Sequence, residues 1–167
     1  MKFTPYKRDL LYRASQGKII VNHLEKKLEK LLISTQAHKN LIDLAKTDKI
    51  IGILNEMNVI ECTERKFTCI NECFSFVASK ISGRNCYILI DDDWKYCGAL
   101  HIDPEVRLNT EFNFDENNSD EIRFIFCDLT TQITIDYFQD TTNPPYECTL
   151  KRYTPITAPI LEPEENR

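Results

Sequence analysis

Three consecutive aspartates, Asp91, Asp92 and Asp93, follow a short apolar run and precede Trp94, the single tryptophan of the chain. Carboxylates gathered in this way can bind a hard cation, form a polar turn, or receive a cationic partner. Their spacing differs from the D-x-D-x-D-G pattern of calcium-binding loops. In an extended segment successive side chains point in opposite directions, so only Asp91 and Asp93 could converge. We therefore expect an exposed acidic loop and no metal site.

Other residue types that support catalysis are few and scattered. The histidines are His23, His38 and His101, and they form no H-E-x-x-H pair. The four glycines cannot be assembled into a phosphate-binding loop, and no G-x-S-x-G motif is present. The sequence thus predicts a protein that is not an enzyme. A small enzyme whose site is not visible in the sequence remains an alternative, because catalytic partners meet in space.

The cysteines favour a reduced interior over a metal site or a disulfide framework. Their number is odd, no C-x-x-C pair occurs, and the nearest pair is Cys69 and Cys73. We expect free thiols that behave as small buried apolar groups. No cofactor is predicted. The seven residues are Cys62, Cys69, Cys73, Cys86, Cys97, Cys127 and Cys148.

Charge is distributed unevenly along the chain. Residues 1–67 contain 13 Lys and Arg against 8 Asp and Glu, whereas residues 68–167 contain 8 against 18. An uneven distribution of this kind affects which partners a protein attracts and how fast they associate. It can equally reflect two solvated surfaces without a functional role.

The helices and strands that must position these residues can be inferred from the sequence. Their order predicts an α+β fold, with an N-terminal helical segment of three to four helices packed on a C-terminal antiparallel sheet. Thr4 and Pro5 signal a helix start and Gly17 a helix stop. Further helices are predicted over 18–32, over 34–46 and over 47–61, the last capped by Thr47. We divide the chain into a helical part (1–60), a mainly antiparallel β part of the same domain (61–142) and a Pro-rich extended tail (143–167).

Alternating apolar residues predict the strands of the sheet. Residues 121–129 and 132–138 give the clearest alternation, and residues 61–70 and 105–114 also read as strands. A helix capped by Asn71 is expected over 71–82. Two further strands, 86–90 and 94–102, flank the aspartates, so we expect Asp91–Asp93 to form the loop of a hairpin.

Length and hydropathy indicate a cytoplasmic protein. The 167 residues contain no apolar run long enough to span a membrane. The first residues carry scattered charges and lack the apolar stretch of a secretory signal. We expect no association with a membrane.

These observations together predict a non-enzymatic, protein-binding inhibitor, of the immunity-protein or antitoxin type, that neutralises a basic, nuclease-type toxin through an acidic surface. Carboxylates would speed the encounter and aromatic side chains would anchor it. The alternative is a winged-helix-like DNA-binding regulator that uses Lys49, Arg65 and Lys66, although the acidic second half makes nucleic acid a poor partner. The expected partner-binding residues are Asp91, Asp92, Asp93, Trp94, Glu116, Asp120 and Glu121.

Overall fold

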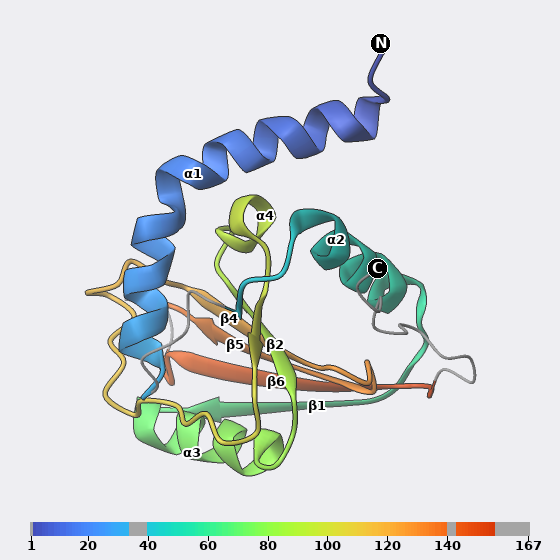
Figure 1. Cartoon of the computed structure of the whole chain (residues 1–167). Helices are drawn as coiled ribbons and strands as arrows, with labels where there is room; N and C mark the ends of the chain where they lie inside the picture. Colours follow the sequence, from blue (N-terminus) through green and yellow to red (C-terminus); the bar gives the residue numbers. More distant parts are fainter. Residues whose placement is uncertain (1, 34–39, 140–142, 156–167) are drawn as a thin grey trace.

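The computed structural model describes residues 2–33, 40–139 and 143–155 as helices layered on one sheet (Figure 1). The elements, in chain order, are α1 (Pro5–Leu31), α2 (Leu44–Glu56), β1 (Val59–Phe67), α3 (Ile70–Ile81), β2 (Cys86–Ile90), α4 (Trp94–Cys97), β3 (Leu100–Ile102), β4 (Glu121–Phe126), β5 (Thr131–Tyr137) and β6 (Tyr146–Tyr153).

The six strands form one antiparallel sheet in the order β1-β6-β5-β4-β2-β3. This arrangement confirms the α+β class with N-terminal helices. In the described part of residues 1–60 there are two helices, where three or four were expected, and the expected helix over 34–46 lies partly outside the described residues. Strand β1, from the predicted strand over 61–70, occupies one edge of the sheet.

Each face of the sheet buries its own apolar cluster. On one face Ile122, Phe124 and Phe126 pack with side chains of α3 and the second half of α1. On the other face Tyr87, Leu89 and Ile125 pack with side chains of α2 and α4. Successive side chains of β4 therefore point alternately into the two apolar clusters. Helix α3 lies on the opposite side of the sheet from α2 (Figure 1).

Helix α1 is longer than predicted because Gly17 does not end it. The helix runs without interruption from Pro5 to Leu31 and changes direction about halfway along its length (Figure 1). Gly17 is buried against α4, and a Cβ atom there would clash with the carbonyl oxygen of Tyr96. Glycine is therefore required for close packing at this position. Thr4 does cap the helix, as expected, by accepting a hydrogen bond from the backbone N–H of Lys7.

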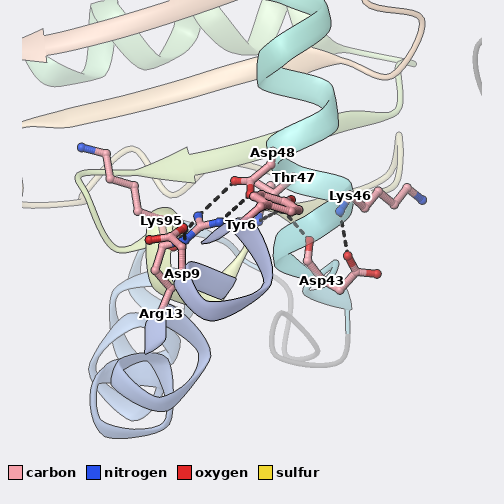
Figure 2. A network of polar contacts seen from close by, with 9 residues as sticks. Tyr6, Asp9, Arg13, Asp43, Lys46, Thr47, Asp48 and Lys95 are labelled. Carbon is pink, nitrogen blue, oxygen red and sulfur yellow. Dashed lines mark hydrogen bonds and ion pairs between the residues drawn. The ribbon is translucent and has the colours of Figure 1, made fainter. Parts of the chain in front are cut away.

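A polar network ties α1 to α2 and α4 (Figure 2). The guanidinium of Arg13 donates to the carboxylate of Asp48 in α2 and to the carbonyl oxygen of Lys95 in α4. The hydroxyl of Tyr6 donates to the same carboxylate at 2.9 Å. Because α4 follows Asp93 directly, these contacts also fix the segment that carries the three aspartates.

The start of α2 differs from the prediction in its capping residue. Asp43, not Thr47, caps the helix, since its carboxylate accepts from the backbone N–H of Lys46 at 2.7 Å. Thr47 lies one turn inside the helix and is buried. Its hydroxyl donates to the carbonyl oxygen of Asp43 and accepts from the backbone N–H of Ala99.

One predicted strand is shortened, a second is absent, and one strand that was not predicted is present. Residues 94–97 form the single turn of α4, so that only 100–102 of the predicted 94–102 strand pairs with β2. Residues 105–114 are irregular, because Asn109 and Asn113 bond to nearby backbone N–H groups and favour turns. Within the predicted tail over 143–167, β6 is an inner strand between β1 and β5, and residues 156–167 lie outside the described residues.

Candidate acidic binding groove

An acidic groove of about 1010 Å³ lies where β2 ends, β4 begins and β5 ends. It collects carboxylates from two segments of the chain, residues 91–93 and residues 115–121. Two cations, Lys27 and Arg123, also line it. The hairpin between β2 and β3 does contain the three aspartates, as predicted, with α4 added to the connection. The six carboxylates of the acidic groove are Asp91, Asp92, Asp93, Asp115, Asp120 and Glu121.

Asp91 and Asp93 do converge, but in a turn and not in an extended segment, and they converge on an ammonium group. The Nζ atom of Lys27 lies 2.6 Å from Oδ2 of Asp91 and 3.1 Å from Oδ2 of Asp93. Lys27 comes from α1, and its side chain is only 6% exposed. Burying a charge is unfavourable unless it is paired, so this triad needs all three members. Burial acts to lower the pKa of Lys27, and its two carboxylate partners raise it above its ordinary value.

Asp91 holds the floor of the acidic groove together. Its second oxygen, Oδ1, accepts from the hydroxyl of Ser119 and from the backbone N–H groups of Asp120 and Glu121. The residue adopts the left-handed conformation, with φ of 47°, which aspartate tolerates better than most residues. Burial acts to raise the pKa of Asp91, but Lys27 and the two backbone donors outweigh it and lower the pKa below its ordinary value. Asp91 is thus a structural carboxylate.

Asp92 and Asp120 have a different environment on the rim. The side chain of Asp92 is 77% exposed and pairs only with the surface residue Lys95 among the described residues. Asp120 is also exposed. Partial burial raises the pKa of Asp120, and the neighbouring carboxylate of Asp91 raises it further. These two carboxylates face solvent and are accessible to a partner.

A row of carboxylates extends from the acidic groove across the sheet. Asp136 of β5 stands opposite Glu121 of β4 on one side and opposite Glu147 of β6 on the other. Like charges directly opposite each other on neighbouring strands are unfavourable. Burial raises the pKa of Asp136, and the two flanking carboxylates raise it further. The row therefore adds negative charge to the sheet next to the groove, although Glu121 pairs with Arg123 and Glu147 pairs with Lys66.

Two of the expected partner-binding residues do not line the acidic groove. Trp94 is 8% exposed and belongs to the core, with the guanidinium of Arg123 5.5 Å from its ring centroid. Its burial removes it as an anchor for a partner. Glu116 is exposed but does not line the acidic groove.

Sequence reasoning missed two residues that do line the acidic groove. Asp115 is exposed and accepts a hydrogen bond from the hydroxyl of Tyr137 at 2.8 Å. Phe138, 40% exposed, is the large apolar side chain of the groove that a partner can reach. Asp115 belongs to the acidic loop 115–120 and was open to prediction from its composition. Phe138 was included in the predicted strand over 132–138, but β5 ends at Tyr137, and the alternation did not indicate that the side chain of Phe138 would be exposed in a groove.

The cysteines follow the expectation in part. All seven cysteines are free; three are buried, two are half-buried, and Cys62 and Cys69 are exposed. Among residues 2–33, 40–139 and 143–155, no group of three or more Asp, Glu, His or Cys side chains is arranged to hold a metal ion. The convergent pair of aspartates is instead occupied by Lys27.

Comparison of the chain with protein-family models, with curated protein sequences and with solved structures gave no match. Within the part of the chain that the structure describes, no helix combines the length and the apolar character needed to cross a membrane.

Proposed function

We propose that this chain is a non-enzymatic, cytoplasmic protein of the immunity-protein or antitoxin type, which captures a basic, nuclease-type toxin in its acidic groove. The observation that carries the proposal is the convergence of six carboxylates with only two cations around one large groove. Nucleases bind phosphates through cationic surfaces, so an inhibitor that covers such a surface needs a matching negative one.

The contacts divide into two groups with different roles. Asp92, Asp115 and Asp120 supply accessible negative charge, which steers a cationic partner and accelerates its association. Phe138 supplies apolar contact area beside them, in the place that sequence reasoning gave to Trp94. Asp91 and Asp93 act indirectly, because they hold the acidic groove in shape around Lys27.

The regulator alternative receives less support from the geometry. Lys49 lies on α2, while Arg65 and Lys66 are adjacent residues of β1 whose side chains point to opposite faces of the sheet. Lys66 pairs with Glu147 at 3.7 Å. The three cations therefore do not form one phosphate-binding surface.

One observation favours the enzyme alternative. Asp91 and Asp120 are neighbouring carboxylates in the acidic groove, and the pKa of one is lowered while that of the other is raised. Carboxylate pairs with separated pKa values serve as acid and base in many active sites. However, Asp91 is occupied by four hydrogen-bond donors, which leaves it no position for a substrate proton.

The test measures association rates with a basic nuclease by surface plasmon resonance at low and high salt. We compare the wild type with the groove variant Asp92→Asn, Asp115→Asn, Asp120→Asn. A control variant, Glu29→Gln, Glu56→Gln, Glu64→Gln, removes the same charge from exposed positions outside the groove. The groove variant should associate roughly tenfold more slowly at low salt, whereas the control should stay within about twofold of the wild type.

Equal rates for the two variants would show that net charge alone governs binding and would overturn the proposal. The same immobilised proteins, exposed to lysate of the native host and analysed by mass spectrometry, identify the natural partner. Recovery of nucleic acid alone, with steep salt dependence, would also contradict the proposal.

A further inference from the structure

A second groove, of about 570 Å³, lies between α3 and the sheet at the opposite end of the strands from the acidic groove. Strand β4 connects the two, since its first residue, Glu121, lines the acidic groove and its last residue, Phe126, lines this one. The six residues of β4 separate the two sites by roughly 17 Å. We call this second site the basic groove.

Its charge is opposite to that of the rest of the chain. Four cations line the basic groove against a single carboxylate, Glu61, although the whole chain carries a net charge of −5. The guanidinium of Arg152 pairs with Glu61 at 3.1 Å. For the other three cations, no carboxylate of the described residues lies within ion-pair distance. These three unpaired cations are Arg65, Lys80 and Arg84.

Aromatic rings hold the unpaired cations in place. The guanidinium carbon of Arg65 lies 4.9 Å from the ring centroid of Phe76, and Nζ of Lys80 lies 5.4 Å from the same ring. The guanidinium of Arg84 lies 5.1 Å from the ring centroid of Phe126. A ring attracts a cation through its charge and does not accept conventional hydrogen bonds from all of its N–H groups. The N–H groups of these cations therefore stay available to a ligand. The donors are therefore positioned but unoccupied by carboxylates.

We propose that the basic groove binds a nucleotide, either free or as part of a single-stranded nucleic acid. Arginine forks match the oxygens of a phosphate, and three unpaired cations fit a ligand with more than one negative charge. The volume exceeds that of inorganic phosphate and falls in the range of small-ligand sites. Phe76 and Leu150, both half-buried, give the groove apolar surface against which a planar base can pack. This inference uses other residues than the acidic groove and does not depend on the proposed function.

The experiment titrates the full chain into a fluorescein-labelled single-stranded oligonucleotide at low salt and follows fluorescence anisotropy. Competition with the unlabelled oligonucleotide, with ATP, with pyrophosphate and with a poly-glutamate peptide identifies the chemistry that is recognised. The basic-groove variant is Arg65→Gln, Arg84→Gln. Its matched control is Arg8→Gln, Arg107→Gln, which changes two exposed arginines outside the basic groove. Circular dichroism checks that both variants are folded.

We expect the wild type and the control to bind the oligonucleotide alike, and the basic-groove variant to bind it at least roughly tenfold more weakly. Displacement by ATP supports a free nucleotide as the ligand, and displacement only by unlabelled oligonucleotide supports a strand. Absence of binding, equal binding by the two variants, or displacement by poly-glutamate as efficient as by the phosphate ligands would each overturn the proposal. A phosphate site at Arg65 and Arg84 can fail while the acidic groove still binds its basic partner.

Discussion

The acidic groove and the basic groove lie at the two ends of β4, and they hold their charges in opposite ways. In the acidic groove a buried lysine neutralises two of the carboxylates, and the exposed carboxylates stand around this structural centre. In the basic groove three cations rest on phenylalanine rings without carboxylate partners among the described residues. The comparison indicates that the buried, paired charges are structural, whereas the exposed charges remain accessible to a ligand.

Loss of Lys27 should produce the largest effect. Replacing Lys27 by Ala leaves Asp91 and Asp93 without their cation, and we expect a loss of about 3–5 kcal/mol in the free energy of unfolding. Urea denaturation measures this loss. The control is Lys26→Ala, an exposed neighbour on α1, which should change stability by less than about 0.5 kcal/mol. Similar values for the two variants would show that the lysine–aspartate triad is not structural.

The adjacent residues Asp91 and Asp92 should respond very differently to the same substitution. Asp91→Asn replaces a carboxylate oxygen with an amide group that has only one acceptor oxygen for these donors. We expect the free energy of unfolding to fall by about 2 kcal/mol. Asp92→Asn should leave stability unchanged within about 0.5 kcal/mol, because its side chain is exposed. Equal losses in urea denaturation would contradict the division between structural and accessible aspartates.

The lowered pKa of Asp91 also predicts how this difference depends on pH. A carboxyl group whose pKa is lowered by folding contributes stability above its unfolded pKa, near pH 4, and loses it as the pH falls through the folded value. The difference between wild type and Asp91→Asn should therefore be full at pH 7 and decrease below about pH 4. Unfolding curves recorded at several pH values test this; a difference that stays constant down to pH 2 would contradict it.

Asp136 should show a smaller effect of the opposite sign. Folding raises its pKa, so the protonated form is favoured, and stability is lost as the pH rises through the folded value. Asp136→Asn should therefore stabilise the protein by up to about 1 kcal/mol at pH 7, and the gain should disappear below about pH 4. Thermal unfolding at the two pH values measures the change. Destabilisation at pH 7 would show that the carboxylate row is not under strain.

The smallest effect is expected at the basic groove. The variant Arg65→Gln, Arg84→Gln removes two exposed contacts between cations and rings, and we expect a loss of no more than about 1 kcal/mol. Urea denaturation alongside Lys27→Ala gives the direct comparison between the grooves. A loss as large as that of Lys27→Ala would show that the cations of the basic groove are structural as well.

The sequence predicted those parts of the fold in which alternation and burial coincide. Strands β4 and β5 were found because Ile122, Phe124, Ile133 and Ile135 face one core. Strand β6 was missed because Pro144 and Pro145 precede it and its inward residues include a cysteine, a weak apolar signal. The turn of α4 was read as a strand because aromatic residues favour strands, whereas here packing on α1 decides the conformation.

The candidate sites could likewise be predicted only where local sequence pattern determines the geometry. The convergence of Asp91 and Asp93 follows from local geometry, but Lys27, 64 residues away from Asp91, follows only from the packing of α1. The basic groove was not visible at all, because Arg84 and Arg152 come from the acidic half of the sequence. Counting charge along the chain therefore cannot replace knowing which side chains meet.

Amide chemical-shift mapping by NMR tests most directly whether the two grooves are separate sites for ligands of opposite charge. One titration uses a short Lys- and Arg-rich peptide, and the other uses ATP. The account predicts that the peptide shifts amides around Asp92, Asp115 and Asp120, and that ATP shifts amides around Arg65, Lys80 and Arg84. Shifts from the peptide that are spread over the whole surface, or that coincide with those from ATP, would contradict it.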